Sequence, residues 1–117
     1  MHDVVRSNVF LRIKKNPYCV ARNTTCYELL KSLIQHPNAD VRLAAISNDL
    51  IDPAMLSELS KDLDHYVRYS VAIHPLTRKK DLTILSYDVN ALVRKGVGEN
   101  MHYYYGAMTK THFLHTH

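Results

Sequence analysis

The sequence predicts an all-α solenoid of short helix pairs, and three observations support this fold class. The segments VRLAAISND, VRYSVAIHP and VRKGVGENM begin at Val41, Val67 and Val93, so they follow one another at 26-residue intervals. Apolar residues within the copies recur at helical spacing, and residues that favour helix starts precede them. A repeat period of about 20 to 50 residues is typical of solenoids, in which each repeat buries its apolar side against the next one.

Six columns match when the copies are aligned at this period. Matches at so many positions in a 117-residue chain indicate a true repeat rather than a chance resemblance. The columns are Leu30/Leu56/Leu82, Leu33/Leu59/Leu85, Val41/Val67/Val93, Arg42/Arg68/Arg94, Ala45/Val71/Val97 and Asn48/His74/Asn100. His74 is interpreted as a hydrogen-bonding substitute for the asparagine of its column.

The first helix of each repeat is predicted from its leucines and from the residues ahead of them. Asp52 followed by Pro53 is expected to cap and begin one such helix. Thr77 and Thr25 stand at the matching places, and Glu28 would complete a capping box with Thr25. In the middle copy, the apolar side of this first helix is predicted to consist of Leu56, Leu59 and Leu63.

The second helix of each repeat is predicted from the valine column. Asn38, Asp64 and Asn90 stand three residues before the valines, where a side chain can bind free backbone amides. The column three residues after the valines is small in every copy, so a neighbouring helix can approach closely there. Its members are Ala44, Ser70 and Gly96. Neither helix is long enough to be stable alone, so stacking has to stabilise both.

One domain is predicted, with irregular ends. Residues 1–24 form an irregular N-terminal unit, in which VFLRIKKNP is expected to be a second helix that ends at Asn16–Pro17, followed by a separating segment YCVARN. Alternatively, Asn23 occupies the asparagine column with one residue deleted. The regular repeats cover about residues 25–100, and residues 101–117 are a cap or tail.

The segment LSKDLDHYVRYSVAIHP resembles the leucine-rich repeat variant family, which is related to HEAT-type repeats. The resemblance covers about residues 25–101 and, weakly, 9–24. It implies a right-handed all-α superhelix in which α and 3₁₀ helices alternate, and a scaffold rather than a specific activity. An iron–sulfur centre, as in the family's founding protein, is not expected, because this chain has only Cys19 and Cys26. The matching residues are Asp62, Asp64, Val67, Arg68, Val71, Ala72 and Pro75.

Composition and the chain's start exclude several classes. The formal net charge of +4 permits acidic partners without requiring them. Two cysteines are too few for a disulfide scaffold, so reduced thiols in a cytoplasmic protein are expected. No apolar run approaches the ~20 residues of a membrane span, and the N-terminus lacks the features of a signal peptide.

The arginine column has two interpretations. A solenoid would place these guanidinium groups at regular intervals, which suits a phosphate backbone or an acidic peptide. The favoured interpretation is structural, because aspartates at suitable positions can pair with the arginines from one repeat to the next. These aspartates are Asp40, Asp62, Asp64 and Asp88.

The C-terminal segment contains Tyr103, Tyr104 and Tyr105 close to Phe113 and Lys110. With the Arg78–Lys80 run, these aromatics could stack on single-stranded nucleic acid. The favoured alternative is a cap that covers an apolar edge around Leu92, Val93 and Val97, either on its own last repeat or on a partner chain in a homodimer. His112, His115 and His117 form no closed ligand set, so no metal is expected.

No enzyme motif is present, and no cofactor is expected. The sequence favours a non-catalytic scaffold that binds another protein, and nucleic-acid binding through an Arg/Lys-lined face is the alternative. The candidate partner-binding residues are Arg42, Arg68, Arg94, Tyr69, Lys95, Arg78, Lys79, Lys80, Tyr103, Tyr104 and Tyr105.

Overall fold

The computed structural model describes residues 13–100, which contain α-helices and turns but no strand. Seven helices lie wholly within this range, and residues 13–15 are helical as well. The prediction of an all-α fold, with six short helices between residues 25 and 100, is therefore confirmed. The chain divides into two compact units, one that ends at Ile51 and one that starts at Asp52.

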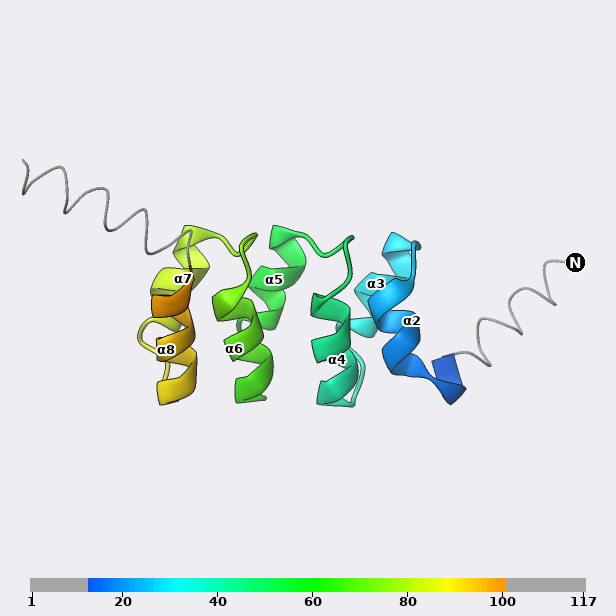
Figure 1. Cartoon of the computed structure of the whole chain (residues 1–117), viewed down its shortest axis with the longest axis horizontal. Coiled ribbons are helices and arrows are strands. Elements are labelled where there is room, and N and C mark those ends of the chain that lie inside the picture. Colours follow the sequence, from blue (N-terminus) through cyan, green and yellow to red (C-terminus); the bar gives the residue numbers. More distant parts are fainter. Residues whose placement is uncertain (1–12, 101–117) are drawn as a thin grey trace, which may run out of the picture. The chain divides into compact units, whose positions relative to one another are not determined.

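The first compact unit contains α2 (Pro17–Asn23), α3 (Tyr27–Leu33) and α4 (Ala39–Ile46). Helices α2 and α4 lie side by side, and α3 packs against α4 (Figure 1). The buried residues at these contacts include Ala21, Leu30, Val41 and Ala45, all with no exposed surface.

The second compact unit contains α5 (Pro53–Leu59), α6 (His65–Ile73), α7 (Lys79–Leu85) and α8 (Ala91–Glu99). Helices α6 and α8 lie side by side, as α2 and α4 do in the first unit (Figure 1). Helix α5 packs against α6, and α7 packs against both α6 and α8. Two neighbouring repeats are thus joined mainly through their second helices.

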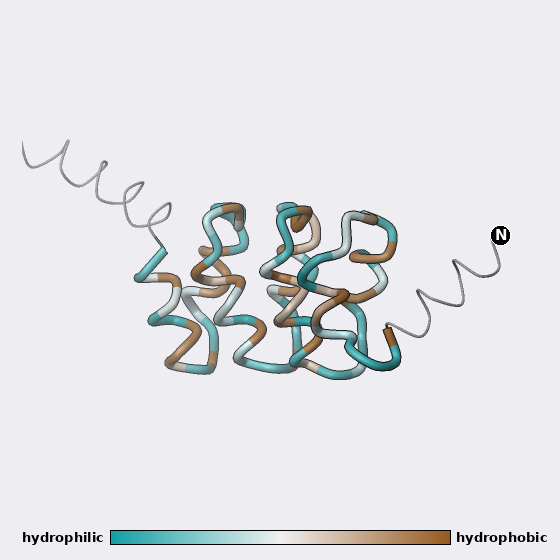
Figure 2. The backbone as a smooth tube through the Cα atoms, turned by 45° about the vertical axis from the view of Figure 1, so that its right-hand side comes forward, coloured by the Kyte–Doolittle hydropathy of each residue, from teal (hydrophilic) through white to brown (hydrophobic). Residues whose placement is uncertain are grey.

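The leucine and valine columns form the core. Leu30, Leu56 and Leu82 are fully buried, and so are the three valines that begin the repeated segments. Figure 2 shows brown, apolar stretches alternating with teal ones along the chain, as expected of helices with one buried side. Leu63 was wrongly predicted to continue the leucine stripe: α5 ends at Leu59, and Leu63 is 98% exposed in the following turn.

The 3₁₀ helices implied by the family resemblance are absent from residues 13–100. The first helices instead begin with α-type bonds four residues apart. The amide of Leu56 donates to the Asp52 carbonyl, and that of Leu82 donates to the Arg78 carbonyl, both at 3.0 Å. These short helices are therefore α-helical from their first turn.

The predicted caps of the second helices are confirmed. Asn38, Asp64 and Asn90 accept bonds from backbone amides at the starts of α4, α6 and α8. Asp52 also caps α5, where its Oδ1 accepts from the Met55 amide at 2.8 Å, with Pro53 as the first helical residue.

The predicted caps at Thr25 and Thr77 are wrong. Helices α3 and α7 begin after Cys26 and Arg78, which make no capping bond through their side chains. The capping box with Glu28 is therefore absent as well. Thr77 is buried and donates its hydroxyl to the Val71 carbonyl at 2.6 Å, which ties the start of α7 to α6.

Asn16 and Pro17 lie between two helices. Residues 13–15 are helical, so a helix ends here as predicted, but Pro17 also begins α2, and the separating segment predicted after it is wrong. The Asn16 side chain caps α2 by accepting from the Cys19 amide at 3.0 Å, and proline suits the first helical position because its missing amide proton is not needed there. The YCVARN segment is thus helical. Helix α2 packs on α4 as α6 packs on α8, and its Ala21 precedes the equivalent Ala72 by 51 residues, one fewer than two repeats. This supports the alternative interpretation, in which one residue is deleted.

The two buried asparagines of the asparagine column join α4 to the end of α2 and α8 to the end of α6. The buried Asn48 amide nitrogen donates to the carbonyls of Ala21 and Thr24 at 2.9 and 3.0 Å. Asn100 donates in the same way to Ala72 and His74, at 2.8 and 2.9 Å. These carbonyls lie at the C-terminal ends of α2 and α6, where a helix leaves its acceptors free.

His74 shares one role of the asparagine column. Its Nδ1 accepts from the Leu76 amide at 3.1 Å, as Asn48 Oδ1 accepts from the Leu50 amide at 2.8 Å. Burial lowers the pKa of His74, which favours the neutral ring that this acceptor role requires.

Gly96 lies at the close approach of α6 and α8. A Cβ atom added there would lie 2.8 Å from the Tyr69 ring and 3.1 Å from the Ala72 Cβ. The prediction that the small-residue column admits a neighbouring helix is confirmed at this position. Gly98, two residues later, has open space around it.

Leu59→Ala should lower the free energy of unfolding by about 2–5 kcal/mol, because Leu59 is 2% exposed and its truncation leaves a cavity. The same change at Leu63 serves as the control and should alter stability by no more than about 0.5 kcal/mol. Urea unfolding measures both variants. Equal losses would contradict the assignment of Leu63 to the surface.

Gly96→Ala and Gly98→Ala should have opposite effects. The second change should stabilise α8 by about 0.5–1 kcal/mol, because alanine favours the helix and meets no neighbour. The first should be destabilising despite the same gain in helix propensity, because the added methyl group collides with α6. Thermal unfolding followed by circular dichroism compares them, and a stabilising Gly96→Ala would contradict the close approach.

Candidate protein interface

Arg68 joins the α5–α6 turn to the α7–α8 turn. Its Nε and Nη2 bind the two carboxylate oxygens of Asp88 at 2.8 and 3.2 Å, and its Nη1 donates to the carbonyls of Asp62 and Leu63 at 2.7 and 3.1 Å. The side chains of Arg68 and Asp88 are only 15% and 10% exposed. This guanidinium therefore makes the pairing between neighbouring repeats that the structural interpretation predicts.

Asp88 is held ionised by its neighbours. Burial alone would raise its pKa, but hydrogen bonds from Arg68 and the Asn90 amide, with the positive charges of Arg68 and Arg94, outweigh it. The net result is a pKa below the ordinary value of 3.8. The carboxylate also orders its own turn, because its Oδ1 accepts from the Asn90 amide at 2.9 Å.

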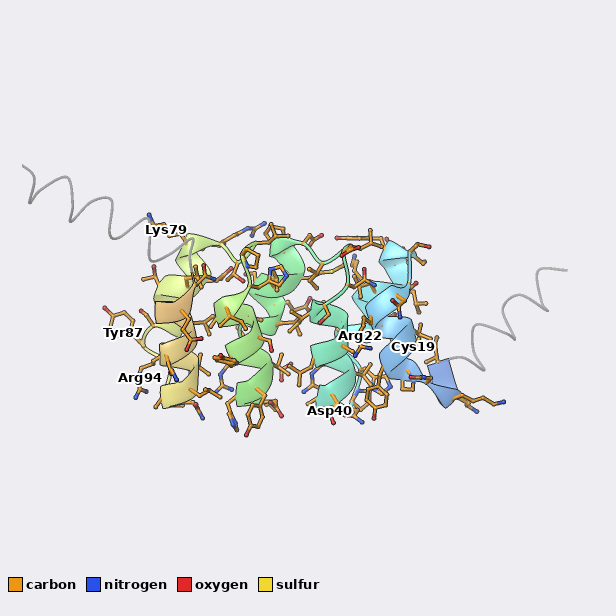
Figure 3. The ribbon with its side chains drawn as sticks, in the orientation of Figure 1. Cys19, Arg22, Asp40, Lys79, Tyr87 and Arg94 are labelled. Carbon is orange, nitrogen blue, oxygen red and sulfur yellow. The ribbon has the colours of Figure 1, made fainter. Side chains whose placement is uncertain are left out.

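The other two arginines of the column also bind carbonyls in the turns before their own helices. Arg42 is partly buried and donates through Nη1 to the carbonyls of His36 and Pro37 at 2.7 and 3.1 Å. Arg94 is exposed and donates through Nη1 to the Asp88 carbonyl at 2.6 Å. In the part of the chain that the structure describes, the Nε and Nη2 of Arg94 have no partner. Figure 3 shows Arg94 and Tyr87 pointing away from α6.

Tyr69 and Lys95 follow the arginines on α6 and α8. The Tyr69 hydroxyl donates to Glu99 Oε2 at 3.2 Å, and burial, with the nearby Glu99 carboxylate, raises the pKa of Tyr69. Tyr69 therefore serves the contact between α6 and α8. Lys95 is exposed, with its Nζ 3.9 Å from Glu99 Oε1.

Arg78, Lys79 and Lys80 are all exposed at the start of α7. Lys79 points outward from this helix in Figure 3. Tyr103, Tyr104 and Tyr105 lie outside the described residues, as does the rest of the predicted cap. Val93 and Val97 are buried, so the apolar edge that this cap was expected to cover is not exposed at these two residues.

The exposed apolar side chains at the turns ahead of α6 and α8 were not predicted from the sequence. Leu63 and Val89 are 98% and 93% exposed, and Tyr87 is 83% exposed. Tyr66 is exposed nearby, in the first turn of α6. Leu63 and Val89 each precede a valine of the repeat by four residues. An apolar residue at this turn position was the sequence feature that could have indicated the exposed side chains. Large side chains left in water at equivalent places form a candidate contact surface.

Asp81 is the buried acidic side chain of α7. Its Oδ1 accepts from the Ser57 hydroxyl at 3.2 Å, while Oδ2 has no hydrogen-bond partner. Nowhere in residues 13–100 do three histidine, cysteine or acidic side chains come together as metal ligands. Cys19 and Cys26 are exposed and unpaired. None of the described helices has the length and apolarity needed to cross a bilayer.

Comparison with known proteins gives no match to a family model, to a curated protein or to a solved structure.

Arg68→Ala should lower the free energy of unfolding by about 2–4 kcal/mol, because it removes the partner of a buried carboxylate and two bonds to turn carbonyls. Arg94→Ala is the matched control from the same column and should cost less than about 1 kcal/mol, because this side chain is exposed. Chemical denaturation of both variants measures the two losses of stability. A loss for Arg68→Ala as small as that for Arg94→Ala would contradict the structural role of Arg68.

The stability that Asp88 contributes should depend on pH. Because its pKa is lower in the folded protein, this contribution is fully present above the ordinary value of 3.8 and is lost as the pH falls through the lowered value. The difference in unfolding free energy between the natural chain and Asp88→Asn should therefore shrink as the pH falls below about 4.

Asp49→Asn is the control for this titration, because Asp49 is an exposed turn residue. Urea unfolding at several pH values between 3 and 7 measures each difference. A difference for Asp88→Asn that stays constant over this range would contradict the role of its ionised form.

Proposed function

We propose that this protein is a non-catalytic repeat scaffold that binds another protein, with the two compact units forming one α-solenoid. The 26-residue register and the shared use of asparagine at helix ends support a continuous stack. The resemblance to leucine-rich repeat variants supports the same architecture. A markedly elongated profile in small-angle X-ray scattering would agree with this stack, and a compact one would contradict it.

The observation that carries protein binding is the exposed apolar surface at the turns ahead of α6 and α8. We define the turn patch as Leu63, Tyr66, Tyr87 and Val89, which are between 55% and 98% exposed. The aromatic members suit a protein interface, because tyrosine buries a large apolar area while its hydroxyl keeps a polar partner. Burial of this patch against another protein would remove the cost of exposing it to water.

Nucleic-acid binding is the second candidate, and the exposed Arg78–Lys80 run favours it. Arg68 does not add to such a surface, because Asp88 already neutralises it. A phosphate backbone also gains little from leucine and valine side chains in turns. The turn patch therefore favours protein, and the basic run alone supports nucleic acid.

The test is affinity capture from native lysate with the full chain as bait, with and without nuclease. Protein partners should remain after nuclease treatment and should be lost with the double variant Leu63→Ser, Val89→Ser. Leu76→Ser is the control, because Leu76 is also exposed but lies in the turn between α6 and α7, outside the turn patch. Capture that disappears with nuclease and falls steeply with salt would support nucleic acid instead.

A further inference from the structure

The side of α8 that faces away from α6, called its outer side, carries the sequence positions that α6 uses to bind α8. Three residues of α6 meet α8 or the turn before it: Arg68 binds Asp88 in that turn, Tyr69 donates to Glu99, and Tyr69 and Ala72 border Gly96. Twenty-six residues later, the same places on α8 hold Arg94, Lys95 and Gly98. All three are exposed, and a Cβ atom added at Gly98 would meet nothing within 4 Å.

Arg94 keeps half of the bonding pattern seen at Arg68. Each arginine donates through Nη1 to the carbonyl of an aspartate in the turn before its own helix, Asp88 for Arg94 and Asp62 for Arg68. At Arg68 the Nε and Nη2 then bind the carboxylate of the next repeat. At Arg94 these two donors are free within residues 13–100. A planar pair of guanidinium donors matches a carboxylate in shape and charge.

We infer that the α8 outer face, defined as Tyr87, Arg94, Lys95 and Gly98, binds a helical hairpin of another protein whose turn presents a carboxylate to Arg94. The inference rests on the proposed function and names its partner class. Gly98 lets a helix approach closely, as Gly96 and Ala72 let α6 and α8 approach. Tyr87, which points to the same side as Arg94, adds apolar contact area next to the charged pair (Figure 3).

Residues 101–117 contain neither aspartate nor glutamate, so their side chains cannot reproduce the contact that Asp88 makes with Arg68. A second copy stacked head to tail also fits poorly, because its α2 would meet α8, and residues 4–16 ahead of α2 contain neither aspartate nor glutamate. The charge of the face therefore points to a different, acidic protein.

The first test uses the α7–α8 hairpin, which packs against α6 in this structure. A synthetic peptide of residues 75–100 is titrated into the full chain while the Arg94 Nε–Hε resonance is followed by NMR. The resonance should shift saturably. Arg94→Gln in the chain, or Asp88→Asn in the peptide, should weaken binding at least about tenfold.

Arg78→Gln is the matched control, because it removes the same charge from an exposed site at the start of α7. It should leave the affinity within about twofold. Equal losses for Arg78→Gln and Arg94→Gln would mean general charge attraction and would overturn the inference. Gly98→Gln should block binding without loss of stability, because it fills the space that the partner helix needs.

A second experiment addresses the case in which the isolated peptide does not fold and therefore does not bind. Residues 75–100 are inserted once more after Asn100 of the full chain, which raises their effective concentration at α8. Asp88→Asn in the inserted copy should then raise the unfolding constant at least about fivefold, but only while Arg94 is intact. Absence of this coupling would overturn the inference.

Two outcomes separate this inference from the proposed function. If captured proteins need Leu63 and Val89 but are indifferent to Arg94→Gln, protein binding stands and the acidic-hairpin contact is refuted. If light scattering shows self-association that Arg94→Gln abolishes, the occupant is a second copy and the assignment to a different protein is wrong. If only nucleic acid is captured while the peptide still binds at Arg94, the proposed function fails and the hairpin chemistry of α8 stands.

Discussion

The structure depends on an asparagine side chain that binds the free carbonyls at the end of the preceding second helix. Helices of seven to nine residues are not stable alone, so each has to be held by its neighbours. One amide nitrogen provides two donors, and Asn48 and Asn100 use both of them. The two bonds fix the axial position of one second helix on the next, and they satisfy acceptors that would otherwise be buried unpaired.

In the second compact unit the contact between α6 and α8 is fixed at three levels. Asn100 binds the C-terminal end of α6, Gly96 lies against Ala72 and Tyr69 in the middle, and Arg68 binds Asp88 near the start. Polar bonds at both ends leave little freedom to slide, while the glycine sets how closely the helices approach. The same three-level arrangement explains why the outer side of α8 has a defined chemistry, since it carries Arg94 and Gly98 and no further repeat packs on them within residues 13–100.

The repeat period, the caps of the second helices and the buried leucine and valine columns could be predicted, because each depends on local spacing. The starts of α3 and α7 could not, because Cys26 and Arg78 give no capping signal and Thr77 forms a tertiary bond instead. Leu63 fits a helical stripe by spacing alone, and only the end of α5 at Leu59 puts it in solvent. The difference between Arg68 and Arg94 depends on whether a neighbouring repeat supplies an aspartate, which a single column of arginines does not reveal.

The most direct test compares Asn48→Asp with Asn38→Asp in the full chain by urea unfolding at pH 7. Both changes replace an amide with a carboxylate of nearly the same shape. Asn48 acts as a donor to two carbonyls, so its replacement should lower the free energy of unfolding by about 2–5 kcal/mol. Asn38 acts as an acceptor at a helix start, where aspartate is equally suitable. Its amide nitrogen also donates to the Tyr18 hydroxyl at an exposed site, but an aspartate can accept from that hydroxyl instead. Its replacement should therefore change stability by less than about 0.5 kcal/mol. Equal effects would contradict the claim that the buried amide donors hold neighbouring second helices together.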